Sequence, residues 1–426
     1  MTFINFIINQ IFREPALFLG IIALVGLLIQ KKSFSEIIKG TFKTIIGVVI
    51  LTQGTSILVN SILPLSNAFN VLYQIQGAAE IKPMGTDKFL ALYGSQIGIA
   101  MVLAFLINLL VARFTKLKNI FLTGHMLFWF PFIFVATAVE AGFNGSGIVI
   151  FATIFTALYI IITPALIRPF VKEVIGDDSF TLGHPTVGLS LVSGFVAKIF
   201  GDKSKSTEDI QFPKQLDFLK EITITSSLVM FIVYIIIGII LGDEQVAKVY
   251  SADKNLIVYS LMQGVLFGAG LTILLTGVRM MLAEIIPAFK GISDKVIPNA
   301  IPALDCPIIF PYAPNAVLIG FIVSMITSVV TLLIVGKVGL FQYAVLPLTI
   351  TCFFEIGTAA VIGNGTGGMR GAIIGSAVAG VIMIFLVGFS VPLLRNTVSD
   401  WILIFGGNDF SLWTIIARGI SKLFGM

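Results

Sequence analysis

Long apolar segments recur along the whole chain, and they restrict its fold more than any other feature of the sequence. At about 1.5 Å of rise per residue, helices of this length can cross a hydrocarbon layer of roughly 30 Å. Ten crossings are expected, at about 15–30, 44–62, 96–112, 120–139, 147–166, 221–242, 256–277, 317–336, 342–361 and 372–393. With 57% hydrophobic and only 12% charged residues, the chain is predicted to be an all-α polytopic membrane protein.

The positions of the basic residues indicate that the odd-numbered segments end on the cytoplasmic side of the membrane. They cluster after the odd-numbered segments, near 31–43, 113–118, 168–172 and 279–295, as the positive-inside rule requires of cytoplasmic loops. A net charge of +5 would also suit a nucleic-acid-binding protein, but these cations are scattered over short loops. We therefore expect a membrane lipid environment and no nucleic-acid partner.

Five segments, a polar loop and five more segments predict two inverted repeats, because an odd number of crossings turns the second half over. The segments "ILTQGTSILV" (50–59) and "LLTGVRMMLA" (274–283) resemble each other slightly. The expected units are a first repeat at 1–200, a cytoplasmic polar loop at 201–220, a second repeat at 221–395 and a C-terminal helix at 396–426. That last stretch, over 398–424, is either an eleventh crossing or an interfacial helix.

Two interrupted apolar segments, near 67–95 and 291–316, predict re-entrant hairpins, since irregular backbone at membrane depth must be buried in protein or line a watery cavity. In the second segment, four prolines within 13 residues break any helix: Pro302, Pro307, Pro311 and Pro314. Asp305 lies near the expected tip. It either caps a half-helix or accepts hydrogen bonds from the hydroxyls of a polyol, and the cost of burying a carboxylate favours the binding role.

Both histidines of the chain follow a glycine, His125 in "LTGHMLFW" and His184 in "TLGHPTVG". Each could be a buried histidine bonded to a neighbouring carbonyl. Because ionisable groups inside a membrane are functional candidates by default, and because the context repeats, we favour substrate contact for both.

Several functions are excluded or disfavoured by the sequence. It has no Walker loop, no H-E-x-x-H zinc motif and no dinucleotide-binding glycine turn, so no cofactor and no metal site are predicted. Two cysteines, Cys306 and Cys352, are too few for a disulfide framework or a cysteine metal site. The glycine-rich run "GNGTGGMRG" is interpreted as a tight turn, with Arg370 at the membrane interface.

Three classes of function remain open from these residues alone. A carrier energised by separate proteins needs no nucleotide site of its own. An ion-coupled secondary transporter could use Asp305 and the histidines as a proton relay. A membrane enzyme acting on a lipid-linked sugar would need paired carboxylates or a metal cluster near one interface, and the sequence shows neither pattern.

Six motifs together resemble one family. In order, they are "FLTGH", "TLGHPTVG", "GDKSKSTEDI", "GVRMMLAEIIPAFKGI", "ALDCPIIFPYAPNAVLIGF" and "GNGTGGMRGAIIG". The chain resembles the ascorbate-type membrane subunit, enzyme IIC, of the bacterial phosphoenolpyruvate-dependent sugar phosphotransferase system, over about residues 10–395. The galactitol-type subunits of the same superfamily are more distant.

This resemblance implies a homodimer in the bacterial cytoplasmic membrane, with a scaffold and a mobile core that carries L-ascorbate by an elevator-type motion. Phosphorylation would be performed by a separate IIB subunit, supplied by IIA, so whether the chain itself counts as an enzyme stays open. The residues that the resemblance implies for substrate binding are His125, Met126, Leu127, Phe128, Trp129, His184, Pro185 and Asp305.

The chain also departs from that pattern. Some ascorbate carriers have glutamine where this sequence has Trp129 and Pro185, which removes hydrogen bonds worth about 1 kcal/mol each. Trp129 could instead stack on a sugar face. A further family contact falls within 74–95, where the sequences cannot be aligned.

Overall fold

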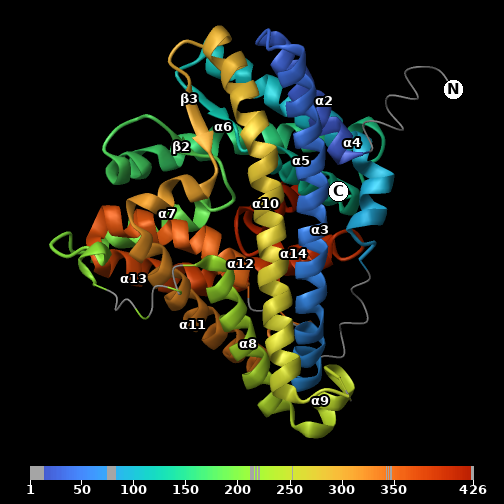
Figure 1. Cartoon of the computed structure of the whole chain (residues 1–426), viewed down its shortest axis with the longest axis vertical. Helices are drawn as coiled ribbons and strands as arrows, with labels where there is room; N and C mark the ends of the chain where they lie inside the picture. Colours follow the sequence, from blue (N-terminus) through green and yellow to red (C-terminus); the bar gives the residue numbers. More distant parts are fainter. Residues whose placement is uncertain are drawn as a thin grey trace.

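The computed structural model describes residues 14–73, 83–211, 215, 218, 221–251, 253–341, 343, 345 and 348–423. Over these residues the chain is a bundle of long helices with one small sheet (Figure 1). The helices are α2 (Pro15–Ile29), α3 (Phe34–Leu72), α4 (Thr86–Phe114), α5 (Gly124–Glu140), α6 (Ser146–Ile175), α7 (Val187–Phe200), α8 (Ile222–Leu241), α9 (Asp243–Val249), α10 (Leu256–Val296), α11 (Pro314–Val338), α12 (Thr349–Thr351), α13 (Gly357–Ser390), α14 (Ser399–Phe405) and α15 (Asp409–Leu423). The strands are β1 (Asn119–Phe121), β2 (Thr181–Leu182) and β3 (Ile301–Leu304), and short 3-10 or π turns are η3 (Thr207–Asp209), η5 (Cys306–Tyr312), η6 (Cys352–Ile356) and η7 (Val391–Leu394).

Seven helical stretches in the described part are long and apolar enough to cross a membrane. The all-α polytopic prediction is thereby confirmed. The other three expected segments fall on α2, on α5 and on the second arm of the helical stretch Thr349–Leu394. The middle of the hairpin expected near 67–95, residues 74–82, lies outside the described residues. The C-terminal stretch forms α14 and α15, of 7 and 15 residues, and both are shorter than a crossing requires.

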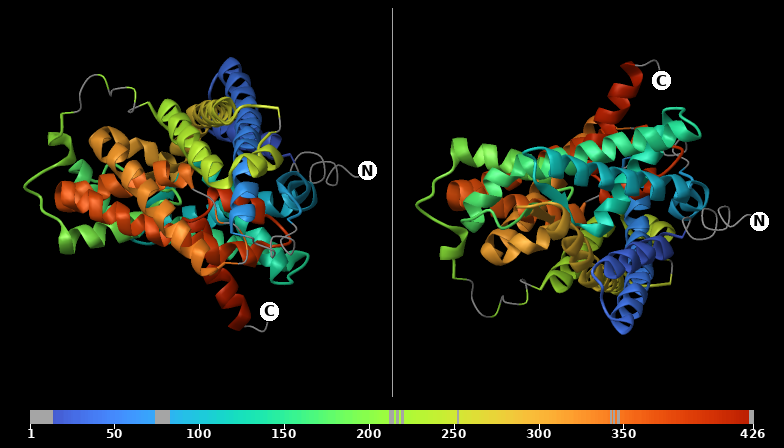
Figure 2. Two further views of the ribbon diagram at one scale, coloured as in Figure 1. Left: turned by 90° about the horizontal axis from the view of Figure 1, so that it is seen from below. Right: turned by 90° about the horizontal axis from the view of Figure 1, so that it is seen from above.

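The main helix contacts fall into three sets. Helix α10 packs on α3 and α8, while α13 packs on α7 and α11, and α6 packs on α4 and α5. Figure 2 shows α3 and α10 together on one side, with α7, α11 and α13 gathered on the other. The division into a scaffold and a mobile core that the sequence resemblance implies stays a prediction.

Small residues let α3 and α10 cross closely. A Cβ at Gly54 would lie 2.4 Å from the Leu274 nitrogen, and one at Gly277 would lie 2.3 Å from the Leu51 nitrogen. Only glycine permits such backbone contact between helices. Each of the two similar segments, 50–59 and 274–283, therefore uses its glycine to contact the other, while their assignment to inverted repeats stays a prediction.

The stretch Thr349–Leu394 is a hairpin rather than one straight helix. The backbone leaves the helical region at Gly367 and at Gly368, whose φ is +61°. A Cβ at Gly363 would lie 3.0 Å from the Ala372 Cα, although nine residues of continuous helix would separate the two by about 13 Å. The glycine-rich run therefore forms the tight turn that the sequence predicts.

The polar loop holds this turn against the start of α11. Glu208 Oε1 accepts from the backbone nitrogens of Asn315 (3.0 Å) and Ala316 (3.2 Å), which neutralises the unpaired amides of the helix N-terminus. The Met369 nitrogen donates to the Lys205 carbonyl at 2.8 Å. The loop thus fixes two elements that are far apart in the sequence.

Candidate functional site

Three short parallel strands, in the order β1-β3-β2, bring the predicted site residues together. His125 follows β1 by four residues, His184 follows β2 by two, and Asp305 directly follows β3. Because the strands are parallel, their carboxyl ends meet at one edge of the sheet, and the three side chains gather there. The polar residues of three distant segments are therefore assembled by a few ladder hydrogen bonds.

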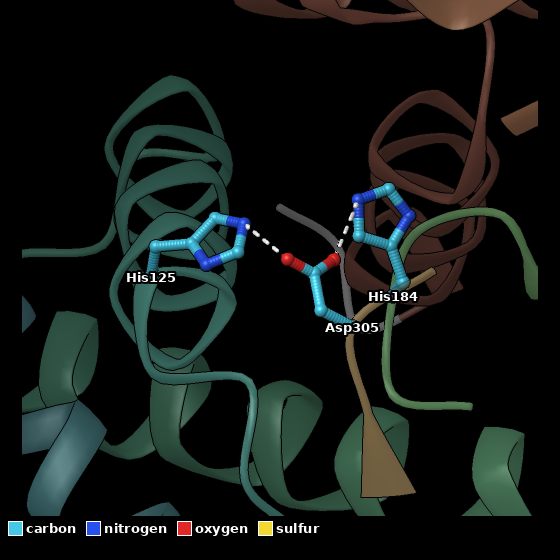
Figure 3. Close-up of side chains that lie close together, drawn as sticks. All are labelled: His125, His184 and Asp305. Atoms are coloured by element: carbon cyan, nitrogen blue, oxygen red, sulfur yellow. Dashed lines mark ion pairs between the residues drawn. The ribbon is translucent and has the colours of Figure 1, made fainter. Parts of the chain in front are cut away.

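Figure 3 shows the carboxylate of Asp305 between the two imidazole rings. Its Oδ2 lies 3.9 Å from His125 Nε2, and its Oδ1 lies 3.6 Å from His184 Nε2. The ring centroids of the histidines are 6.4 Å apart. Both histidines are buried, and the Asp305 side chain is 15% exposed. These distances exceed a direct hydrogen bond, so the three groups can each accept a further polar partner.

Asp305 also has the structural role that the sequence left open. Its Oδ1 accepts from the Cys306 backbone nitrogen at 2.8 Å and caps the 3-10 helix η5. The broken segment after α10 is therefore a strand followed by a capped 3-10 turn. Capping fixes Oδ1 of the carboxylate, while Oδ2 lies toward His125 Nε2.

Tyr159 and Asp409 anchor the backbone around His184. Its carbonyl oxygen lies 2.9 Å from the Tyr159 hydroxyl, which is also 2.8 Å from Asp409 Oδ2. The other carboxylate oxygen of Asp409 accepts from the Gly188 nitrogen at 2.8 Å, and the Asp409 nitrogen donates to the Pro185 carbonyl at 3.0 Å. A buried network of this kind holds a loop in one conformation.

A cavity of about 560 Å³ opens at this edge of the sheet. Its volume lies within the usual range for a small-molecule site. Of the predicted site residues, His125, Met126, Trp129, His184 and Asp305 line it. Leu127, Phe128 and Pro185 are not among its lining residues, and their contact with a substrate stays a prediction.

The cavity also contains residues that sequence analysis did not propose. Glu355 and Arg279 add polar groups, and Trp401, Phe405 and Phe410 extend the aromatic wall around Trp129. Trp129 and Trp401 have ring centroids 4.9 Å apart. A single glutamate within the apolar run "TCFFEIGTAA" was a usable signal for Glu355, whereas the aromatic residues look like ordinary membrane-helix composition.

Two imidazoles and a carboxylate are also a possible ligand set for a metal ion, and their ligand atoms lie within 4.8 Å of one another. A histidine that binds metal normally donates its other ring N–H to a carboxylate, carbonyl or water. Here Nδ1 of both His125 and His184 is buried without a hydrogen-bond partner among the described residues. None of the described residues therefore supplies the supporting contact of a metal centre, and the geometry suits hydrogen bonding to a polar ligand better.

Comparison with known proteins identifies the family of the chain. Residues 10–409 match the family model described as "PTS system sugar-specific permease component". The chain is also similar to the "Ascorbate-specific PTS system EIIC component" of Mycoplasma pneumoniae. The two are 24% identical over an alignment of 471 positions, which covers 97% of this chain and 70% of that protein.

Proposed function

This chain belongs to the family of sugar-specific permease components of the phosphotransferase system, and from that premise we propose that it binds L-ascorbate and carries it across the membrane. It is a multi-pass membrane protein, and the family implies a sugar substrate and soluble IIA and IIB partners. The finer proposal concerns which sugar is bound, by which residues and by what motion.

The observation that carries the proposal is the composition of the cavity. Polar groups of His125, His184 and Asp305 gather along one edge, while Trp129 and Trp401 form an aromatic wall. L-Ascorbate has a flat lactone ring whose face can stack on an indole and whose hydroxyls can reach a carboxylate and imidazoles. The printed name of the Mycoplasma relative supports the same substrate.

Transport requires that the site open alternately to each side. The cavity is lined by Leu51 of α3 and by Leu274 and Arg279 of α10, and also by Phe353, Phe354 and Glu355 of η6, a turn that packs on α11 and α13. A binding site at the seam between two packed groups supports an elevator-type motion, in which one group slides along the other.

The remaining parts of the proposal follow from the family. The protein would act as a homodimer in the bacterial cytoplasmic membrane, and the IIB subunit would phosphorylate the sugar at the cytoplasmic face. No Walker loop is present in the sequence, which suits a carrier whose energy comes from phosphoenolpyruvate through those partners.

The deciding experiment is uptake of labelled L-ascorbate into vesicles containing the chain, with and without phosphoenolpyruvate and the soluble relay proteins. We expect phosphorylated ascorbate to accumulate only with the relay, whether or not an ionophore is present. Relay-dependent uptake of a different polyol would refute the substrate and keep the mechanism. Uptake that needs no relay and is abolished by the ionophore would establish the ion-coupled alternative.

A further inference from the structure

A second carboxylate, that of Glu355, faces the cavity from a π-helical turn. Glu355 lies in η6 (Cys352–Ile356), directly before α13. Single π turns insert an extra residue into a helix and occur often at functional sites. Glu355 is 4% exposed, and it lines the same cavity as His125, His184 and Asp305.

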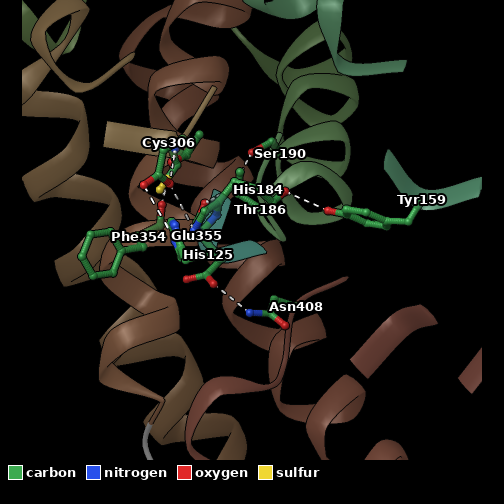
Figure 4. Close-up of polar contacts among 11 residues, drawn as sticks. His125, Tyr159, His184, Thr186, Ser190, Cys306, Phe354, Glu355 and Asn408 are labelled. Carbon is green, nitrogen blue, oxygen red and sulfur yellow. Dashed lines mark hydrogen bonds and ion pairs between the residues drawn. The ribbon is translucent and has the colours of Figure 1, made fainter. Parts of the chain in front are cut away.

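One oxygen of this carboxylate accepts a hydrogen bond, and the other has no partner among the described residues. Oε1 accepts from Asn408 Nδ2 at 2.7 Å, as Figure 4 shows. Asn408 is itself fixed, because its Nδ2 also donates to the Phe405 carbonyl at 2.9 Å and its Oδ1 accepts from the Phe410 nitrogen at 3.1 Å. Oε2 is buried and has no hydrogen-bond partner among the described residues.

Leaving a buried carboxylate oxygen without a donor is costly, because that oxygen has lost its hydrogen bonds to water and has no protein donor in their place. A donor from a bound ligand would remove that cost. Most other groups lining the cavity are aromatic or aliphatic, so few protein donors are available there.

The backbone of Glu355 is also tied to the histidine loop. Its carbonyl oxygen accepts from Thr186 Oγ1 at 2.7 Å, and Thr186 follows His184 by two residues. The position of the Glu355 side chain is therefore set relative to His184 by one short hydrogen bond, with Asn408 fixing its orientation. The group is pre-organised rather than free to turn away.

We infer that Glu355 is a further substrate-binding residue, whose Oε2 accepts a hydrogen bond from one hydroxyl of the bound sugar. This inference rests on the proposed function and adds a specific contact to it. It predicts that the site recognises a polyhydroxylated ligand through two separate carboxylates, Asp305 for one hydroxyl and Glu355 for another.

The test is a thermodynamic cycle that compares the natural protein with Glu355→Gln, each with L-ascorbate and with analogues that each lack one hydroxyl. Equilibrium binding is measured on the purified full chain in detergent. We expect the Gln variant to bind the parent sugar about tenfold or more weakly, the scale for a lost charged hydrogen bond. For the analogue that lacks the hydroxyl bound by Glu355, the variant and the natural protein should have the same affinity, because the contact is absent from both.

Glu140→Gln is the matched control. Glu140 also accepts several hydrogen bonds, from the Asn396 nitrogen (2.6 Å), Asn396 Nδ2 (3.1 Å) and Thr397 Oγ1 (3.1 Å), but it does not line the cavity. Its affinities should match those of the natural protein. If Glu355→Gln does not fold, Glu355→Asp retains the charge with one methylene fewer and should lose the same single-hydroxyl contribution.

Equal losses against every analogue, or no loss against the parent sugar, would overturn the role of Glu355 while leaving the proposed function intact. If the natural protein binds no L-ascorbate but binds another polyol, the proposed substrate fails. The same cycle with that polyol and its deoxy analogues then decides the role of Glu355 separately.

Discussion

Replacing Asp305 by asparagine tests the centre of the site with the least change of shape. In the natural protein Oδ1 accepts from the Cys306 nitrogen, so the variant must keep its amide oxygen in that position. Its NH2 group then takes the place of Oδ2, which lies toward His125 Nε2. A sugar hydroxyl that donates to Oδ2 would meet a donor instead of a charged acceptor.

Hydrogen bonds to charged groups contribute about 1.5–3 kcal/mol, and a sugar hydroxyl can recover part of this by turning so that its oxygen accepts from the amide NH2. We therefore expect Asp305→Asn to weaken sugar binding by about 1–3 kcal/mol, or roughly 5- to 150-fold in Kd. Isothermal titration of the purified protein in detergent would measure the change directly. The cap on η5 should survive, so the thermal unfolding midpoint should stay close to that of the natural protein.

Asp305→Ala provides the comparison, because it removes both the acceptor and the cap. It should weaken binding and also lower stability by about 0.5–2 kcal/mol, as loss of a helix cap does. A folded Asp305→Asn variant with unchanged affinity would refute the assignment of Asp305 as a substrate acceptor. Loss of stability without loss of affinity in Asp305→Ala would show that the cap, and not the binding contact, is the main function of this residue.

Three further predictions concern the two histidines, the polar loop and the glycine turn. His125→Ala and His184→Ala should each weaken sugar binding by titration, and a loss in only one of them would contradict a shared site. Glu208→Ala should lower the thermal unfolding midpoint, since it leaves the Asn315 amide unpaired at a cost of about 1–3 kcal/mol, while sugar affinity should be unchanged. Gly368→Ala should reduce the yield of folded protein in size-exclusion chromatography, because its φ is +61° and its Cβ would lie 2.1 Å from a backbone oxygen; normal yield would refute the tight turn.

The membrane architecture could be predicted from the sequence because it depends on local composition. An apolar segment of sufficient length must become a helix in lipid, whichever helices later surround it. The turn at Gly367–Gly368 was predictable for the same reason, since adjacent glycines mark it in the sequence. Helix α7 was not expected, because its 14 residues are too few to resemble a crossing.

The small sheet could not be predicted, because its strands are two to four residues long and their partners lie far away in the chain. Asn119 pairs with Ile301, and Thr181 pairs with Ala303. No local pattern records such pairings. His125, His184 and Asp305 were nevertheless found separately, since an ionisable residue in an apolar segment is conspicuous on its own. Their common location was implied only by the resemblance to a family, because no local pattern places the three residues together.

Trp129 and Pro185 stand where some ascorbate carriers have glutamine, and the structure shows what surrounds each of them. The backbone carbonyl of Pro185 accepts from the Asp409 nitrogen, and Pro185 does not line the cavity. Trp129 packs against Trp401, and both line the cavity together with the polar groups that follow the strand ends. A flat ring with hydroxyls along one edge can satisfy both surfaces at once, whereas an acyclic polyol has no face to stack on the indoles. On the proposed function, we therefore expect an indole in place of an amide to favour a planar sugar lactone over an open-chain polyol.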